Sequence, residues 1–255
     1  MILRASKTPI GPGRGLAVGG SSGRAYPYTI GARLKGWWGA EWVTTSGGLV
    51  TAFDDQSPFA RDGIPPSPLA RPLYDDSLGF PAVYCGGSQY FEVVSEYAES
   101  MPADDWTTFG VVMADDAALN QVFMNCGIKS VNSGYAQIFT SAAKWGIRVP
   151  PVGTVLDGDA DADLHYVVVG RASGTLHMAV DNIEVALDAP TAGVTAPSGV
   201  TLIPALTSAL WLLVGLWMQG GAITPGLTGW PGTGNPTTGE LAKLWQYING
   251  KYHIT

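Results

Sequence analysis

The sequence predicts an all-β sandwich of two antiparallel sheets with one short C-terminal helix. Three observations support this class. The chain has 255 residues, a length that one large sandwich can occupy as a single domain. Its 34 glycines and 18 prolines, with only 14% charged residues, suit many strands joined by tight turns. Apolar or β-branched runs of strand length recur along the chain, and a helical period occurs only near its end.

The predicted strands are short runs bounded by Gly, Pro, Asp or Ser. The first ones cover residues 34–38, 49–53, 82–85, 90–94, 107–113, 121–126 and 136–140. A meander follows over 164–170, 175–180 and 183–187, and Asp181-Asn182 supplies its second turn. Asp and Asn tolerate the positive φ that two-residue hairpins need, so these strands should pair antiparallel. We expect roughly twelve strands over residues 34–235.

The most apolar run covers residues 209–218, inside a stretch from 189 to 239 without any charge. A transmembrane helix needs about 20 mostly apolar residues, and this run has ten. The run therefore favours one or two buried strands covered on both faces over insertion into a membrane.

The helical period is found at the C-terminal end. Thr238 is a suitable cap, and Leu241, Leu244, Trp245 and Ile248 recur at spacings of three and four. Gly250 is a typical helix terminator. The pattern predicts a helix over 238–249, the only substantial one.

Two parts of the chain differ in charge. Residues 1–33 carry five basic side chains and no acidic one, whereas residues 34–255 carry nine basic and 21 acidic side chains. We expect 1–33 to be an extended basic arm, because its glycines and prolines disfavour a helix, and 34–255 to be the sandwich domain. The arm is either a disordered terminus or an assembly segment that binds an acidic neighbouring subunit. The partner-binding candidates are Arg4, Lys7, Arg14 and Arg24.

Charge and cysteine content exclude several classes. A net charge of −7 and a pI near 4.8 argue against a nucleic-acid binder. Cys85 and Cys126 are the only cysteines, so no disulfide scaffold or cysteine metal motif is expected, and a single bridge between them stays open. The N-terminus lacks the apolar core of a secretory signal, so we do not expect export.

Several segments of the chain are similar to the motifs of one known family of domains. Trp37 lies in a segment similar to an opening tryptophan strand, and residues 53–57 are similar to a W-x-D-x-S strand with Phe53 in place of tryptophan. Arg71-Pro72 is similar to an R-P turn, and residues 240–252 to a closing helix. In this order, over roughly residues 34–255, the segments resemble the concanavalin A-like, laminin-G-like domains of phage and bacterial proteins.

The resemblance implies a concanavalin A-like jelly-roll sandwich that acts as a lectin-like or structural module of bacteriophage particles. We therefore expect a capsid decoration or tail component, located on the virion after assembly in the host cytoplasm and anchored by the arm. Expected partners are other virion proteins and further copies of the chain, with host-surface glycans as candidate ligands. The alternatives are a free carbohydrate-binding lectin and a glycosidase on the same fold.

The sequence predicts that the chain is not an enzyme. Jelly-roll glycosidases resemble one another in an E-x-D-x-x-E strand that places two carboxylates around one glycosidic bond, and no such strand is present. A histidine base for a nucleophile could come only from His165, His177 or His253. His165 and His177 lie in strand patterns, where a hydrogen-bonded structural histidine is the usual case.

Two further features are candidate binding sites. Alternating carboxylates precede the meander, at Asp157, Asp159, Asp161 and Asp163. They form either a solvated acidic turn, a calcium site or a contact for a basic partner, and no other cofactor is expected. Trp230 lies in a Gly/Pro loop, where it either stacks on a sugar, fills a neighbour's pocket or packs beneath its own loop.

Overall fold

The computed structural model describes residues 34–56, 60, 62–77, 79–85, 89–93, 106–114, 117–118, 121–126, 136–149, 153–172, 175–185, 200–202, 210–219 and 238–254. The described residues form sixteen strands and one α-helix. The strands are β1 (Leu34–Ser46), β2 (Leu49–Asp55), β3 (Gly63–Ile64), β4 (Leu73–Asp75), β5 (Ala82–Cys85), β6 (Phe91–Val93), β7 (Trp106–Ala114), β8 (Gln121–Cys126), β9 (Ala136–Ser141), β10 (Lys144–Val149), β11 (Gly153–Asp159), β12 (Leu164–Ala172), β13 (Thr175–Val180), β14 (Ile183–Val185), β15 (Val200–Leu202) and β16 (Leu210–Gln219). A short 3-10 helix covers Pro68–Ala70, and α1 covers Thr238–Tyr252.

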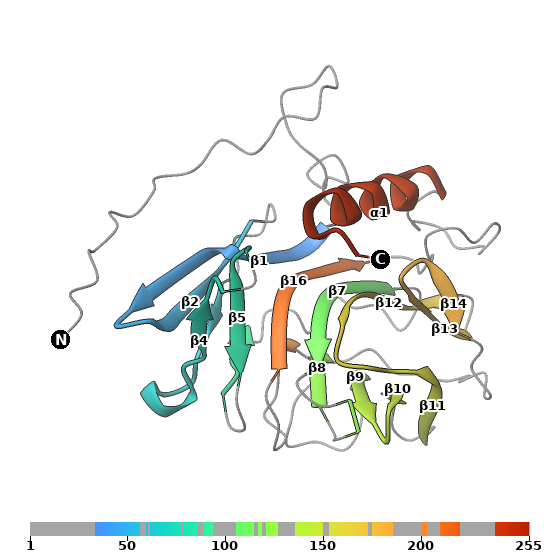
Figure 1. Ribbon diagram of the computed structural model, residues 1–255, viewed down its shortest axis with the longest axis horizontal. Coiled ribbons are helices and arrows are strands. Elements are labelled where there is room, and N and C mark those ends of the chain that lie inside the picture. Colours follow the sequence, from blue (N-terminus) through green and yellow to red (C-terminus); the bar gives the residue numbers. More distant parts are fainter. Residues whose placement is uncertain are drawn as a thin grey trace.

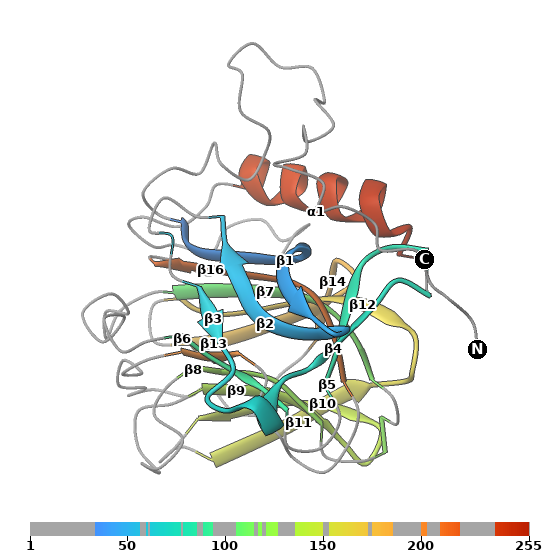
Figure 2. The ribbon, with the colours of Figure 1, turned by 90° about the vertical axis from the view of Figure 1, so that its left-hand side faces the viewer.

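The strands pair antiparallel throughout, which confirms the predicted fold class. One layer contains β16, β7, β12, β13 and β14, and a second contains β8, β9, β10 and β11 (Figure 1). Strands β2, β4 and β5 continue the hydrogen-bonded path between the layers, so the two layers are parts of one folded sheet. Figures 1 and 2 both show α1 over β16, β7 and β12, on the side away from β9–β11.

The apolar run at 209–218 forms the central strand β16. It pairs with β7 along one edge and with β1 and β5 along the other. The prediction of a strand is confirmed for residues 210–218. Within the described residues, no helix has the length and apolar character needed to cross a membrane.

The meander is confirmed together with its second turn, whereas the first predicted turn, Ser173-Gly174, lies outside the described residues. β12 pairs with β7 and β13, and β13 pairs with β14. Val180 lies opposite Ile183, which leaves Asp181 and Asn182 as a two-residue loop with φ of 50° and 69°. These positive φ values match the turn type whose twist suits antiparallel strands.

Strands β10 and β11 were not predicted, and they replace part of an expected loop. The turn before β10 consists of Ala142 and Ala143, with φ of 52° and 55°. Alanine is not typical of such turns, because the left-handed backbone conformation costs it roughly 1–2 kcal/mol. The sequence pattern therefore contained no hairpin signal. The backbone N–H groups of these alanines donate to the carbonyls of Ala118 and Ala117, which stabilises the turn from outside.

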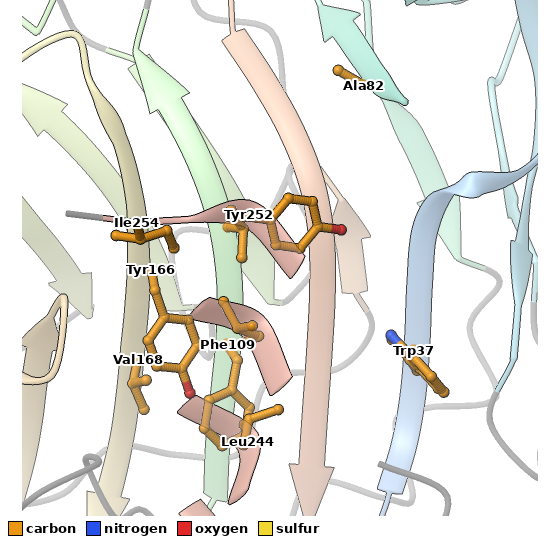
Figure 3. Packing of buried hydrophobic residues seen from close by; sticks show 10 residues of the cluster. Trp37, Ala82, Phe109, Tyr166, Val168, Leu244, Tyr252 and Ile254 are labelled. Carbon is orange, nitrogen blue, oxygen red and sulfur yellow. The ribbon is translucent and has the colours of Figure 1, made fainter. Parts of the chain in front are cut away.

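A buried cluster joins α1 to the sheet. Leu244, Ile248 and Tyr252 follow one helix face at spacings of four and share a buried cluster with Phe109 and Tyr166. Figure 3 shows Leu244 beside Phe109. The other members of the cluster are Trp37, Ala82, Val111, Val168 and Ile254. Burying each large aliphatic side chain contributes roughly 1.5–3 kcal/mol, so this cluster fixes α1 on the sandwich.

The helix extends beyond its predicted end. It passes through Gly250 to Tyr252, and the left-handed φ of 52° occurs at His253 instead. The backbone N–H of His253 donates to the carbonyl of Asn249. The burial of Tyr252 in the cluster favours the extra turn, since Tyr252 reaches the sheet only while the helix continues. The strand estimate is corrected as well, to sixteen in the described residues.

Candidate functional site

A bulge in β1 is the starting point of the site. Between the pairs Trp38–Asp55 and Val43–Phe53, β1 advances five residues while β2 advances two. Bulges of this kind bend a strand and redirect its side chains. Glu41 and Trp42 lie within the bulge, so neither follows the simple alternation of a strand.

The strand before the bulge is held by a buried carboxylate. Asp55 Oδ1 accepts a hydrogen bond of 2.8 Å from the backbone N–H of Trp37, and the N–H of Gln56 donates to the Trp37 carbonyl. Asp55 is the aspartate of the predicted W-x-D-x-S strand. It fixes the point from which the bulge leaves the sheet.

Gly39 provides the space that the bulge needs. A Cβ at this position would lie 2.7 Å from the Trp42 ring and 2.8 Å from Glu41 Oε2. Real Cβ atoms essentially never make such close contacts. Glycine at position 39 therefore lets both side chains cross the strand backbone and approach α1.

Lys251, in the last turn of α1, meets these side chains. Its ammonium forms an ion pair with the Glu41 carboxylate, and the two side chains are 28% and 24% exposed. The same ammonium lies 5.6 Å from the centre of the Trp42 ring, 5.9 Å from that of Tyr247 and 5.1 Å from that of Tyr252. A cation at such distances is attracted to the ring faces.

The aromatic rings hold one another in place. Trp37 contacts Trp42 edge to face with centroids 4.7 Å apart, and Tyr247 at 6.4 Å. Tyr252 contacts Phe80 in the same manner at 5.4 Å. Figure 3 shows Tyr252 over β16 and Trp37 on β1 nearby. Trp42 and Tyr247 are half-buried against the buried cluster, so both residues reach the protein surface beside the ion pair.

Two tyrosines near Glu41 have raised pKa values. Burial raises the pKa of Tyr252, and the charge of Glu41 and the nearby Tyr247 raise it further. Burial raises the pKa of Tyr74 too, with added contributions from Asp76 and Glu41. Both hydroxyls therefore keep their protons at neutral pH. We call Glu41, Trp42, Tyr247 and Lys251 the bulge site.

A second polar cluster lies at the start of β12. His165 Nδ1 lies 2.6 Å from Asp181 Oδ2, and His165 Nε2 lies 2.8 Å from Asp161 Oδ1. Asp181 Oδ1 accepts the backbone N–H of Tyr166, and the Trp145 ring lies edge-on to the imidazole at 5.3 Å. Burial lowers the pKa of His165, but the hydrogen bonds to Asp181 and Asp161 outweigh it and raise the pKa overall. The prediction of a hydrogen-bonded structural histidine at 165 agrees with this geometry.

The four predicted calcium ligands do not form one loop. Asp157 and Asp159 lie in β11, where the sequence predicted a loop. Asp159 pairs with Lys144 at 2.8 Å, and this hydrogen bond lowers the pKa of Asp159. Asp161 binds His165, which lowers the pKa of Asp161, and accepts the backbone N–H of Asp163.

The described side chains contain no group of three His, Cys, Asp or Glu residues arranged to hold a metal ion. The side chain of Asp157 lies outside the described part, so the three interpretations of these aspartates, a solvated acidic turn, a calcium site and a contact for a basic partner, stay open. Trp230 and the arm residues also lie outside it. The arm residues are Arg4, Lys7, Arg14 and Arg24.

Cys85 is buried and free, and burial raises the pKa of its thiol strongly. The open question of a bridge to Cys126 is therefore decided against a bridge from Cys85. A buried thiol with a raised pKa is a poor nucleophile, because the thiolate is the reactive form.

Sequence reasoning did not identify the bulge site. Gly39 within a strand pattern is a signal for a bulge, and Tyr247 and Lys251 lie one helical turn apart. Neither signal indicates that residues 41 and 251 meet, because this contact spans 210 positions of sequence.

No known family model matches the chain, and no curated protein matches it. Solved structures do share its fold. Trypanosoma rangeli sialidase aligns with a TM-score of 0.56 and 10% identity over 86% of this chain and 33% of the sialidase. A mutant of that sialidase displaying trans-sialidase activity aligns with a TM-score of 0.59 and 11% identity, over 91% of this chain and 35% of the mutant. The botulinum neurotoxin type G receptor binding domain aligns with a TM-score of 0.55 and 8% identity, over 85% of this chain and 52% of the toxin chain.

The chain thus spans about a third of the sialidases and about half of the toxin chain. At these identities the likeness shows a shared β-rich fold. One expectation needs correction, because the prediction that the chain is not an enzyme is contradicted by the presence of sialidases among the structures with this fold. The missing E-x-D-x-x-E strand was too narrow a criterion, because not every glycosidase uses a pair of carboxylates in this way.

Proposed function

We propose that this chain is a carbohydrate-binding sandwich on the surface of a bacteriophage particle, with the bulge site as its sugar contact. Carbohydrate binding is supported by the fold shared with sialidases and by the side chains of the site. The phage setting is supported by the sequence resemblance described above. The two parts are tested separately.

The observation that carries the proposal is the combination at the bulge site. Sugars present apolar C–H faces and hydroxyl groups side by side. The half-buried rings of Trp42 and Tyr247 supply flat apolar surface, while Glu41 and Lys251 supply an acceptor and a donor next to it. A few placed polar groups among aromatic side chains are typical of small-molecule sites.

Binding is tested on a glycan array with the full chain and two variants. Trp42→Ala removes one ring of the site and is expected to abolish the signal. Ile183→Ser serves as the control, because this side chain is 71% exposed in β14 and outside the bulge site. Equal binding by wild type and Trp42→Ala, with both proteins folded by circular dichroism, would refute the site.

The phage setting is tested on purified particles. Mass spectrometry of virions should detect the chain, and a version without residues 1–33 should fold but fail to incorporate. The arm carries five basic side chains and the remaining chain is acidic, so its contact should weaken as salt rises. Normal incorporation of the truncated chain would reject the anchoring role of the arm.

Glycoside hydrolysis is the second candidate, favoured by the sialidases among structures of this fold. The protein is incubated with the glycans that it binds on the array, and the released sugar is measured. This measurement distinguishes glycoside hydrolysis from binding alone. If wild type releases sugar and Glu41→Gln does not, catalysis occurs at the bulge site. Binding without release of sugar supports carbohydrate binding as the function of the site.

A further inference from the structure

We infer that the bulge site takes a neutral saccharide with two adjacent hydroxyl groups, in preference to a saccharide that carries a carboxylate. The inference rests on the proposed function, because it names the ligand class of the same site. It is drawn from the charges and hydrogen-bonding groups around Lys251.

The charge balance of the site disfavours an anionic ligand. The ammonium of Lys251 is already paired with Glu41. An incoming carboxylate would meet the Glu41 carboxylate and a cation that Glu41 already neutralises, and like charges at short range repel.

Displacement of Glu41 by a ligand carboxylate is also costly. Both side chains of the pair are about three-quarters covered. Breaking such a pair leaves the Glu41 carboxylate partly buried without its cation, which costs more than an exposed pair would. On the strand side the carboxylate lies against Gly39, since Glu41 Oε2 is only 2.8 Å from where a Cβ of residue 39 would stand.

A neutral sugar can use the intact pair. A hydroxyl group donates one hydrogen bond and accepts others, an ammonium donates up to three and a carboxylate accepts several. Two adjacent hydroxyls can therefore donate to Glu41 and accept from Lys251 while the ion pair persists. Both contacts are charge-assisted, and such hydrogen bonds are the stronger kind.

The rings complete the recognition of a neutral sugar. Trp42 is held edge to face by Trp37, and Tyr247 contacts the same tryptophan. Because these contacts fix the rings before a ligand arrives, little side-chain freedom is lost on binding. The apolar C–H face of the sugar then covers the exposed parts of Trp42 and Tyr247.

The electrostatic field of the whole chain also disfavours anionic glycans. Its formal net charge is −7, so anionic glycans are repelled during approach. Neutral glycans do not experience this repulsion.

The experiment uses an array that carries each neutral glycan beside the same glycan ending in sialic acid. Wild type is expected to bind the neutral member of a pair more tightly. Glu41→Gln keeps the shape but removes the charge, so affinity for the best neutral glycan should fall about tenfold. Lys251→Met keeps the apolar stem among the rings but removes the charge, and it should reduce the affinity for the same glycan by a similar factor. Ile183→Ser should bind as wild type.

Each outcome decides a different claim. Preference of wild type for the sialylated members overturns this inference and leaves carbohydrate binding intact. Tighter binding of them by Glu41→Gln than by wild type supports it, because the amide no longer neutralises Lys251. Unchanged neutral binding by Glu41→Gln overturns the inference as well. Absence of binding to every glycan overturns the proposed function itself.

A second variant covers the case in which Glu41→Gln fails to fold by circular dichroism. Gly39→Ala retains both charged groups and displaces Trp42 and Glu41. It should lose neutral-glycan affinity, and full affinity in this variant would contradict the inference.

Discussion

Glu41 and Lys251 form an ion pair between residues that lie 210 positions apart in the chain. Glu41 comes from the bulge in β1, and Lys251 from the last turn of α1. The pair is partly exposed, and exposed pairs contribute about 0–1 kcal/mol to stability. Its larger effect is to orient Lys251 among the three rings.

Gly39→Ala should disturb the bulge without deleting any group of the site. The new methyl would overlap the Trp42 ring and the Glu41 carboxylate. We expect a loss of about 1–3 kcal/mol in the free energy of unfolding, as for other overpacked positions. Urea titration measures it, and an unchanged midpoint would mean that the two side chains move aside freely.

Gly250→Ala should stabilise the protein. Gly250 lies within α1, and no atom lies within 4 Å of a Cβ built there. Alanine in a helix interior is favoured over glycine by roughly 0.5–1 kcal/mol. A higher melting temperature is expected. Had Gly250 ended the helix in a left-handed conformation, alanine would lower the melting temperature instead.

His165 should make stability depend on pH. Its pKa is raised in the folded chain by Asp181 and Asp161, against the opposing effect of burial. A raised folded pKa gives stability that is fully present below the unfolded value near 6.5 and is lost as the pH rises through the folded pKa. Melting curves of wild type should therefore shift downward over that interval.

The control for this pH dependence is His165→Gln, which retains hydrogen-bonding groups but does not titrate. Its melting temperature should vary less over the same interval. The groups facing the imidazole in the described part are Asp161, Asp181 and the Trp145 ring. An identical profile in both proteins would show that another group carries the dependence.

Calcium should leave the melting temperature unchanged. A ligand that binds only the folded chain raises its stability by mass action. Asp159 and Asp161, however, are already paired with Lys144 and His165. Thermal melting in excess calcium and in excess chelator tests this, and a higher melting temperature with calcium would support the predicted aspartate site.

The sequence alone determined the elements whose signals are local. The strands at 82–85, 121–126 and 175–180 have the predicted bounds. Asp181 and Asn182 form the predicted turn, because their side chains tolerate positive φ wherever they occur. The helix face of Leu244 and Ile248 follows from the period of 3.6 residues.

Only the tertiary structure decided the features that depend on contacts between distant segments. Ala142 and Ala143 adopt left-handed φ because residues 117–118 accept their N–H groups. The last turn of α1 forms because Tyr252 is buried against the sheet.

The bulge site belongs to this second class. Glu41 and Lys251 have no pattern in common along the chain, and they meet because a bulge in β1 and the end of α1 are fixed on the same sheet. Local propensity is a property of neighbouring residues, whereas the pairing of residues 41 and 251 is a property of how the folded layers pack.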